Sequence, residues 1–420
     1  MNDRRILTAE SVTEGHPDKV CDAIADGVLD ACLAEDPGAR VACEVLATAG
    51  KITVAGEITA KTMPDISAIV ARTVREIGYP SSDYEIEVIT HDQSLDIAAA
   101  VGGGRQTGAG DQGVVYGYAC LETDALLPLP VVLAHRLTRM LANARRLGTI
   151  RGLGPDGKAQ VSVEYLFGLP SRIASVVVSC QHDEDKDLEE LRREVLERVI
   201  TPALEELPPD RETEILINPG GRFVLGGFEA DTGLTGRKVM ADTYGGLVPH
   251  GGGALSGKDG KGGPNRSPAK RVRLGEEAQG SERSFRRQAE TETSGLCADE
   301  DRSGAYMARY IAKNIVAAGL AERCTVSLAY AIGKADPVAV DVDAHGTGEY
   351  PDQVLEQAVR GVFDLTPNGM IRALGLDKPI FARFCRYGHF THPDAPWERT
   401  DRGQALEGAC RFWGTGVSNR

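Results

Sequence analysis

Residues 10–35 read ESVTEGHPDKVCDAIADGVLDACLAE, and this stretch sets the first element of the fold. From Lys19 to Glu35 the apolar residues recur at the spacing of one helical face, which predicts an amphipathic helix. His16 and Asp18 crowd against Lys19 just before this helix. A helix N-terminus attracts anions, a carboxylate there can hold Mg²⁺, and histidine and lysine can bond phosphate oxygens. A capped helix start with solvated charges explains the same spacing, so both interpretations stay open.

Strand and helix patterns follow this helix and recur along the chain. Val41–Ala47 and Lys51–Thr59 are rich in β-formers and flank a short segment containing Gly50, which indicates a hairpin. Further strands are predicted at residues 84–90, 160–167, 173–179, 325–332 and 338–342, and further helices at residues 65–78, 185–207, 304–318 and 351–363. The recurrence of strand pairs and helices predicts an α+β protein made of three similar α/β subdomains.

The composition excludes several classes of protein. The net charge of −14 argues against a nucleic-acid or anionic-membrane partner. No apolar run is as long as a membrane helix, and the N-terminal residues lack the apolar core of a signal peptide. Nine cysteines without a CxxC pair are typical of buried, reduced thiols, and the HxxH of His389 and His392 has no third metal ligand nearby, which favours a structural pair. We therefore expect a cytoplasmic enzyme.

Two glycine-rich loops are candidates for nucleotide binding. GAGDQG at residues 108–113 permits close backbone approach, and Asp111 has the chemistry to bond a ribose or a base edge, although a simple turn explains the loop equally well. GGGALSGKD at residues 251–259 fits the spacing GxxxxGK, but Asp259 stands where a P-loop needs serine or threonine. No apolar strand runs into it. We therefore predict a phosphate-binding loop of another type, with Lys258 acting as a point charge.

A third segment, NPGGRFVLGGFEADTGLTGRK at residues 218–238, combines six glycines with basic and aromatic side chains. Two arginines and a lysine in it carry the charge needed to clamp a triphosphate. A phenylalanine offers a ring to stack on a purine, and an aspartate offers a carboxylate for a substrate amine or hydroxyl. An arginine beside glycines is as often a surface turn, so the two interpretations are balanced. The side chains concerned are Arg222, Phe223, Asp231, Arg237 and Lys238.

Taken together and in this order, these segments resemble the S-adenosylmethionine synthetase family, from Leu7 to about Asp401. The motifs that carry the resemblance are ESVTEGHPDK, ARVACE, GEIT, GAGDQG, GLTGRK, DTYGG, HGGGALSGKD, DRSGAYMARYIAKNIVAAGLAERC and YGHF. The resemblance implies the family's α+β fold, in which three subdomains surround a pseudo-threefold axis. The implied N-terminal, central and C-terminal subdomains are residues 1–102, 108–223 and 224–400, followed by a tail at residues 401–420.

The resemblance also implies a reaction. Family members join the sulfur of L-methionine to C5′ of ATP, release tripolyphosphate, and cleave it to phosphate and pyrophosphate. They use two Mg²⁺ ions per site and one K⁺ per subunit. They assemble as homodimers or homotetramers whose active sites are shared across the tight subunit interface.

Site residues follow from the motif positions. The implied ATP contacts are His16, Asp111, Asp156, Lys158, Arg222, Phe223, Asp231, Arg237, Lys238, Ala254 and Lys258. The implied methionine contacts are Glu57, Gln93 and Asp231. The implied metal ligands are Asp18 and Asp301 for Mg²⁺ and Glu44 for K⁺. The implied catalytic residues are His16, Lys158, Arg237, Lys238 and Lys258.

The chain departs from the family pattern in two places. Residues 260–300 separate SGKD from DRS, where the family has a short link containing a lysine. This stretch is polar and mixed in charge, which predicts a disordered insertion. Lys261 is the nearest candidate for the family's lysine, with Lys270 or Arg271 as alternatives. Two functions therefore stay open, an active transferase and a non-catalytic ATP-binding paralogue or regulatory subunit. The gate at residues 94–107 is also short, which predicts weaker methionine capture.

Overall fold

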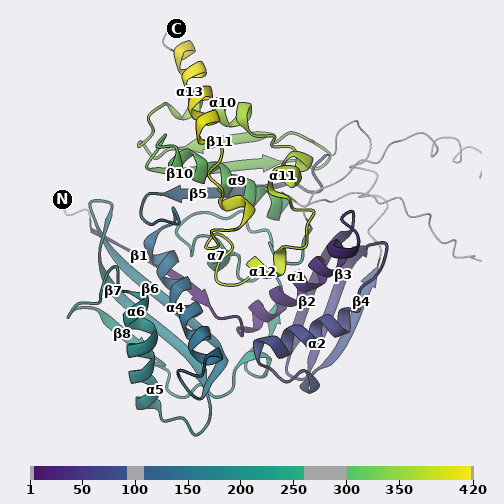
Figure 1. Cartoon of the computed structure of the whole chain (residues 1–420), viewed down its shortest axis with the longest axis vertical. Coiled ribbons are helices and arrows are strands. Elements are labelled where there is room, and N and C mark those ends of the chain that lie inside the picture. The colour runs from purple at the N-terminus through teal and green to yellow at the C-terminus, as the bar shows by residue number, and fades with distance from the viewer. Residues whose placement is uncertain (1–3, 92–107, 260–299, 418–420) are drawn as a thin grey trace, which may run out of the picture.

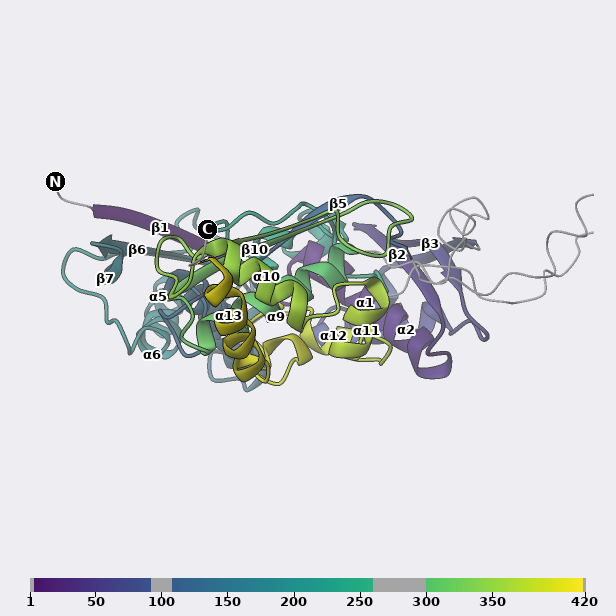
Figure 2. The same cartoon turned by 90° about the horizontal axis from the view of Figure 1, so that it is seen from above.

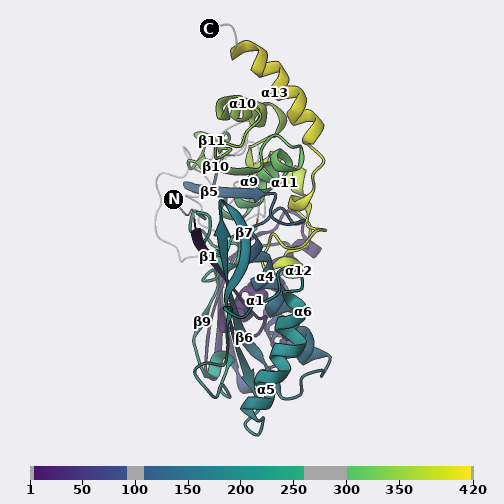
Figure 3. The ribbon, with the colours of Figure 1, turned by 90° about the vertical axis from the view of Figure 1, so that its left-hand side faces the viewer.

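The computed structural model of the chain describes residues 4–91, 108–259 and 300–417. Three sheets form three lobes, each with helices packed against it (Figure 1). Viewed from above, the molecule is wide and shallow (Figure 2). Viewed from the side, strands lie mainly on one side and helices mainly on the other (Figure 3). The predicted α+β class with three units is confirmed.

The first sheet has the order β4-β3-β2-β9. Its strands are β2 (Arg40–Thr48), β3 (Lys51–Thr59), β4 (Glu85–His91) and β9 (Gly233–Leu234). Strands β2 and β3 form the predicted hairpin, and β4 joins β3 in parallel. Helices α1 (Pro17–Glu35) and α2 (Ile66–Ile77) accompany this sheet. α2 begins at the side-chain cap of Asp65 and ends at Gly78, whose φ of 119° is the left-handed conformation that suits glycine.

The second sheet has the order β1-β6-β7-β8. Its strands are β1 (Arg4–Val12), β6 (Leu153–Leu166), β7 (Leu169–His182) and β8 (Glu214–Ile217), and its helices are α4 (Leu129–Arg146), α5 (Leu188–Val195) and α6 (Thr201–Ala203). Apolar side chains of α4 and β6 form the centre of a separate core in this lobe. The single long helix predicted at residues 185–207 is wrong in detail, because a π-helical turn at Leu196–Ile200 separates α5 from α6.

The third sheet has the order β11-β10-β5, from β5 (Gly113–Cys120), β10 (Arg323–Tyr330) and β11 (Ala339–Asp343). Around it lie the helices α7 (Val239–Asp242), α9 (Glu300–Ala317), α10 (Asp352–Val362), α11 (Pro367–Leu374), α12 (Phe381–Phe384) and α13 (Gly403–Val417). The C-terminal tail predicted at residues 401–420 is therefore largely helical over its described part, and α13 packs beside α10.

Each sheet contains one strand from a distant part of the chain. β1 is first in sequence but pairs with β6, and β5 pairs with β10. β9 pairs with β2, with Leu46 opposite Leu234. The three lobes are therefore interleaved, since none of the three sheets is made from one continuous stretch of chain.

α1 lies where the first and third lobes meet, and its sequence explains why. His16 caps the helix and Pro17 occupies its first turn, where a missing N–H costs nothing. Val20, Ile24 and Val28 are fully buried and belong to a core that also includes α9. The helix is thereby held on several sides, which matters for the polar residues along it.

Candidate active site

Four aspartates on α1 follow one another at intervals of four residues, and each one accepts a backbone N–H group from a distant part of the chain. Asp18 accepts the N–H of Leu234 at 3.0 Å, and Asp22 accepts that of Gly236 at 2.9 Å. One turn further, Asp26 accepts the N–H of Gly257 at 2.9 Å. The fourth, Asp30, accepts the first N–H groups of α12 at 2.9 Å each. Because residues four apart share a helical face, these carboxylates form a row, which we call the α1 aspartate row.

The same two loops are held from the other side by β2. The N–H of Cys43 donates to Gly257 at 2.9 Å, and the N–H of Thr235 donates to Val45 at 3.0 Å. Lys258 forms a β-bridge with Ala42. The loops therefore lie side by side along one edge of β2. Lys258 sits in this extended contact. The predicted absence of a P-loop concerns residues after Asp259, which lie outside the described part of the chain.

The first loop presents two cations beside a buried carboxylate. Asp18 is 1% exposed, and its Oδ2 accepts a hydrogen bond from Lys238 Nζ at 2.5 Å. Arg237 Nε lies 3.5 Å from Asp18 Oδ1. Burial alone would raise the pKa of Asp18, but the hydrogen bond from Lys238 and that from Leu234 lower it below its ordinary value. Asp18 is therefore an ionised, preorganised anchor for both cations.

His16 lies next to this group. Its Nδ1 accepts the N–H of Asp18 at 3.2 Å as the cap of α1. Burial, and then the charge of Lys238, lower the pKa of His16 to about 4. The charge of Lys158 also lowers this pKa, and the charge of Asp231 raises it. At neutral pH the imidazole is uncharged, so it can donate one hydrogen bond to an anion without adding a charge.

Lys158 and Asp156 approach the same place from β6. Lys158 Nζ bonds Glu10 Oε2 at 2.6 Å across the β1–β6 pair. Asp156 is buried, and its Oδ2 accepts the N–H of Gly227 at 2.9 Å. Burial raises the pKa of Asp156 to about 6. Asp231 itself is exposed in the loop that follows Gly227.

Arg222 and Phe223 belong to the loop that follows β8, and this loop lies beside the last residue of β7, His182. The Phe223 N–H donates to His182 Nε2 at 3.1 Å, and the ring is half-buried. Arg222 is exposed and its NH2 lies 3.3 Å from Glu184 Oε1. The loop continues to Val224, whose carbonyl accepts from Gln181, the residue that also bonds the N–H of Asp156. These two residues therefore border the Asp156 end of the site.

Lys258 and Asp301 meet across the unusual segment of the sequence. Lys258 Nζ lies 3.0 Å from Asp301 Oδ2, and the two side chains are 20% and 27% exposed. A Cβ added to Gly253 would come within 1.9 Å of Asp301 Cγ, so only glycine allows this approach. Ala254 packs against Gly236, next to Arg237. The 251–258 loop thus touches both Asp301 and the cation-bearing loop.

The remaining predicted residues that the structure describes are Glu44, Glu57 and Asp111. Glu44 and Glu57 lie on neighbouring strands of the first sheet, and Glu57 Oε1 is 3.1 Å from His91 Nε2. Asp111 is exposed and accepts the N–H of Gln112 at 2.7 Å, just before Gly113, which lies against Asp301. Gln93, the gate at residues 94–107 and the insertion with Lys261, Lys270 and Arg271 lie outside the described residues.

Three family models match the chain in succession. The S-adenosylmethionine synthetase N-terminal domain matches residues 4–100, the central domain residues 106–223, and the C-terminal domain residues 225–272 and 293–399.

The chain belongs to the S-adenosylmethionine synthetase family.

Named relatives agree with the family. The chain is 47% identical over 425 residues to the S-adenosylmethionine synthase of Thermus thermophilus, in each of two strains, with 96% of this chain and 98% of the relative covered. It is 45% identical over 412 residues to the S-adenosylmethionine synthase of a Nitratiruptor species, with 96% and 97% covered. The family model for the C-terminal domain is interrupted only over residues 273–292, inside the predicted insertion.

Sequence reasoning offered Lys19 as a phosphate contact, whereas the residue is buried and supports this synthetase-family site from inside the protein; its partners Asp22 and Asp242 were missed. Lys19 is 1% exposed, and its Nζ lies 2.8 Å from Asp242 and 3.1 Å from Asp22. Although burial opposes it, these two carboxylates raise the pKa of Lys19. The spacing DxxxDxxxDxxxD within α1 was visible in the sequence and could have pointed to the aspartate row. Its partners lie more than two hundred residues away along the chain and gave no local signal.

The HxxH pair is structural, as predicted. His389 is fully buried and its Nδ1 bonds the hydroxyl of Tyr306 at 2.7 Å, while His392 Nε2 bonds the carbonyl of Arg386 at 2.9 Å. The eight cysteines in the described part of the chain are all buried and free. No helix among the described residues is long and apolar enough to cross a membrane.

The described residues offer single carboxylates for metal ions. Among these residues there is no group of three or more histidine, cysteine or acidic side chains that could hold a metal ion by itself. Mg²⁺ in nucleotide enzymes is commonly held by one or two carboxylates together with substrate phosphates and water. Asp18 and Asp301, each beside a lysine, suit this mode in synthetase-family chemistry and leave the rest of the coordination shell to the substrate.

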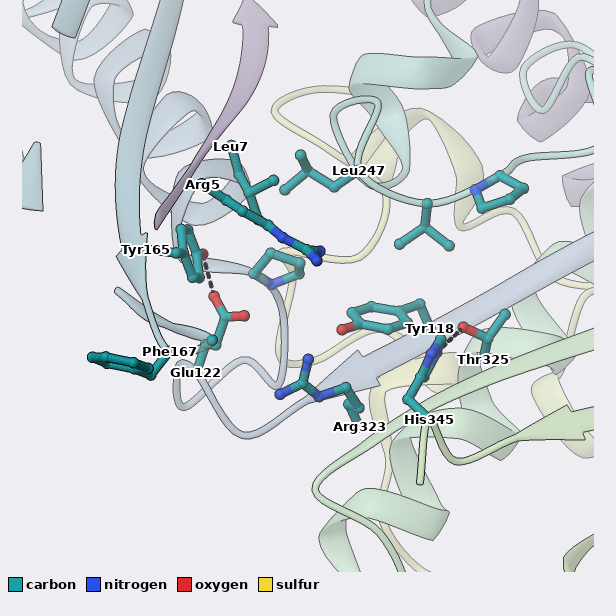
Figure 4. A pocket seen from close by; sticks show the side chains of 14 residues that line it. Arg5, Leu7, Tyr118, Glu122, Tyr165, Phe167, Leu247, Arg323, Thr325 and His345 are labelled. Carbon is teal, nitrogen blue, oxygen red and sulfur yellow. Dashed lines mark hydrogen bonds between the residues drawn. The ribbon is translucent and has the colours of Figure 1, made fainter. Parts of the chain in front are cut away.

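A separate cavity of about 580 Å³ lies where the second and third sheets meet (Figure 4). Arg5 and Arg323 point into it from different strands, and Phe167 lies at its margin. Tyr165 donates to Glu122 at 2.6 Å in its wall, and Thr325 bonds His345 at 2.8 Å. None of its lining residues is a predicted ATP, methionine or metal contact. The cavity is therefore distinct from the site on the edge of β2.

Proposed function

We propose that the chain is a methionine adenosyltransferase, which makes S-adenosylmethionine from ATP and L-methionine. The single observation that carries the proposal is the contact between Lys258 and Asp301 at 3.0 Å. These two residues flank the unusual segment, and they are implied to serve the same phosphates and metal. Their contact supports an intact site despite the added residues between them. The relatives described above are S-adenosylmethionine synthases, which supports the same activity.

The proposed reaction needs alignment and charge neutralisation more than proton transfer. The methionine sulfur attacks C5′ of ATP, the C5′–O bond breaks, and tripolyphosphate leaves with the bonding electrons. A thioether sulfur carries no proton, so no general base is required. The catalytic power must then come from holding sulfur and C5′ in line and from stabilising charge on the leaving group.

The residues on the edge of β2 are suited to that task. Arg237, Lys238 and Lys258 supply positive charge for the triphosphate, and Lys158 approaches from β6. His16, uncharged at neutral pH, donates a hydrogen bond near the reacting carbon. Asp231 would hold the methionine amine, and Phe223 would stack on the adenine. The same cations then hold tripolyphosphate while water cleaves it to phosphate and pyrophosphate.

Two Mg²⁺ ions per site and one K⁺ per subunit complete the proposal. Asp18 and Asp301 would hold the magnesium ions, and Glu44 the potassium ion. When bound, these cations add positive charge around the leaving group. The chain's own contribution is to hold both aspartates in place, each of them beside a lysine.

Unit boundaries and location are also proposed. The three subdomains would meet near residues 102–108 and 223–224, with residues 260–300 as an insertion into the third. A cytoplasmic location is in keeping with eight buried, free cysteines in the described part of the chain.

A direct assay separates the transferase from a non-catalytic ATP-binding subunit. Pure protein is incubated with ATP, L-methionine, Mg²⁺ and K⁺, and S-adenosylmethionine, phosphate and pyrophosphate are measured. We expect all three products in equal amounts, because each turnover releases one tripolyphosphate. ATP binding without any product in the full chain would contradict the proposal and support a regulatory subunit.

We further propose that two copies associate through the strand side of the molecule, as a dimer or a tetramer of such dimers. Exposed apolar side chains lie on strands of all three sheets, among them Ile6, Leu46 and Val114 at 53%, 50% and 41% exposure. Leu46 shares its face of β2 with Glu44, since side chains two apart point the same way. A partner on this face would cover the apolar residues and complete the site near Glu44.

Leu46→Asp tests this association. A charge on the proposed interface should convert the assembly to monomers and abolish product formation, because the active site is shared. Leu147→Asp is the matched control, since Leu147 is 77% exposed at the end of α4 and away from the sheets. Molar mass from light scattering after size exclusion gives the result. A Leu46→Asp protein with unchanged mass and activity would contradict the proposed interface.

A further inference from the structure

Asp26 of the α1 aspartate row forms hydrogen bonds with the segments on both sides of the insertion. Its Oδ1 accepts the N–H of Gly257 at 2.9 Å, just before the chain leaves the described residues after Asp259. Its two oxygens also accept both terminal nitrogens of Arg302, at 2.7 and 2.8 Å. Arg302 follows shortly after the chain returns at Glu300. One carboxylate therefore holds the segment that leads out and the segment that leads back.

Arg302 strengthens the tie with further contacts. Its NH1 also donates to the carbonyl of Lys258 at 3.3 Å, so it reaches across to the outgoing segment itself. Its Nε donates to the hydroxyl of Tyr306 at 3.0 Å, and its guanidinium lies 4.1 Å from the ring centre of Phe381. Asp26 and Arg302 are both 0% exposed. Such a bidentate pair has a fixed geometry, and removal of one partner leaves a buried charge without compensation.

The tie acts directly on two residues of the proposed active site. Lys258 follows Gly257, and Asp301 precedes Arg302, so the pair fixes the backbone next to each of them. The entropic cost of bringing two chain ends together grows with the length of the connection. Forty residues, 260–299, separate the described ends here, so a contact between Lys258 and Asp301 requires something other than a short link to hold it.

We propose that Asp26 and Arg302 are positioning residues that hold Lys258 against Asp301, so that the phosphate site survives the long connection between them. The inference rests on the proposed function for what Lys258 and Asp301 bind. The pair itself touches neither substrate nor metal. The effect of removing this pair should therefore depend on the length of the connection, whereas the effect of removing an ordinary buried ion pair should not.

A matched ion pair on the same helix provides the control. Arg309, two turns along α9 from Arg302, donates to both oxygens of Glu398 at 2.9 and 2.8 Å. These side chains are 0% and 1% exposed. The two pairs thus share the helix, the two-pronged arginine–carboxylate contact and the burial. Glu398 differs in that it also accepts from Lys313 Nζ at 2.7 Å and holds no residue that flanks the insertion. Glu398→Gln reports the effect of weakening a buried pair in general.

The test compares two backgrounds, the full chain and a chain in which residues 260–299 are replaced by a short Gly-Ser link containing one lysine. Asp26→Asn, Arg302→Lys and Glu398→Gln are made in both. Hydrogen exchange in peptides covering residues 251–259 and 300–312 reports on the ends directly and does not depend on activity. Tripolyphosphate affinity in the presence of Mg²⁺, measured by calorimetry, reports on the site.

We expect Asp26→Asn to weaken tripolyphosphate binding about tenfold in the full chain, which corresponds to about 1.4 kcal/mol, and to speed exchange at both ends. In the shortened chain both changes should be much smaller, and Glu398→Gln should have the same effect in the full and the shortened chain.

Equal effects of Asp26→Asn in the two backgrounds would overturn the proposal. If Asp26→Asn folds only in the shortened chain, the proposal is supported. If it folds in neither, the same comparison with Arg302→Lys, which keeps the buried charge, decides. Failure of the full chain to make S-adenosylmethionine would instead contradict the proposed function and leave the exchange comparison valid.

Discussion

Replacement of Lys258 by methionine should lower kcat by a factor of about 10² to 10³, the usual effect of removing one preorganised charge from a site where charge develops. Lys258 Nζ lies 3.0 Å from Asp301 Oδ2, and the backbone of Lys258 is held by the β-bridge to Ala42. Methionine keeps the length and most of the volume of the side chain and removes only its charge. The effect should appear in kcat more than in KM for methionine, because the charge acts on the leaving group.

Stability should change little in this variant, because the ion pair is partly exposed and such pairs contribute about 1 kcal/mol or less. Lys186→Met is the matched control, since Lys186 makes a similar contact with Glu194 at 2.7 Å on α5. Steady-state kinetics and thermal unfolding on both variants separate a catalytic effect from a structural one. A kcat within about threefold of the unmodified protein, with phosphate release intact, would remove Lys258 from its proposed role.

Asp18→Asn should cause a loss of similar size and also raise the Mg²⁺ concentration needed for half-maximal activity. The amide oxygen can still accept the N–H of Leu234, but the charge that holds Lys238 at 2.5 Å and Arg237 at 3.5 Å is lost. The pair is buried at Asp18, so removal of one partner also lowers the free energy of unfolding, by up to about 3–5 kcal/mol for a fully buried pair. Activity must therefore be compared at a temperature where the variant is folded.

Asp36→Asn is the control that separates the effect of Asp18→Asn on catalysis from its effect on stability. Asp36 is equally buried, accepts the N–H of Gly38 at 2.9 Å and pairs with Lys61 at 3.1 Å. Its pKa is likewise lowered by these partners, against the effect of burial. We expect Asp36→Asn to reduce stability and to leave kcat and the Mg²⁺ requirement unchanged. If Asp18→Asn behaves in the same way, Asp18 is a structural residue only.

Local elements of the fold were predictable where the pattern and its ends were both clear. α1 has a strong apolar face, and Asp65 and Gly78 mark the ends of α2. α4 was missed although its leucines recur every four residues from Leu129 to Leu141, because no polar cap precedes it. The interruption between α5 and α6 was not predictable, since a π-helical turn keeps the same residues on a helical path.

The site was predictable only in part, and for a physical reason. Motif positions identified the charged residues of the proposed site. Their arrangement depends on contacts such as Asp22 with Gly236 and Asp26 with Arg302, which join positions far apart in sequence. A backbone N–H on glycine leaves no trace in the residue type, so a carboxylate that binds it appears in the sequence as one more surface charge.

The interleaving of the three sheets has a consequence for how the protein is made. β5 has β10 as its strand partner, so it leaves the ribosome long before that partner is synthesised, and the first sheet likewise waits for β9. Unpaired strand edges in a growing chain are sites of aggregation. Chains that terminate before β9 and β10 should therefore be captured by chaperones or degraded, because their first and third sheets are incomplete. The first and third lobes can therefore be completed only late in translation, after β9 and β10 have been made.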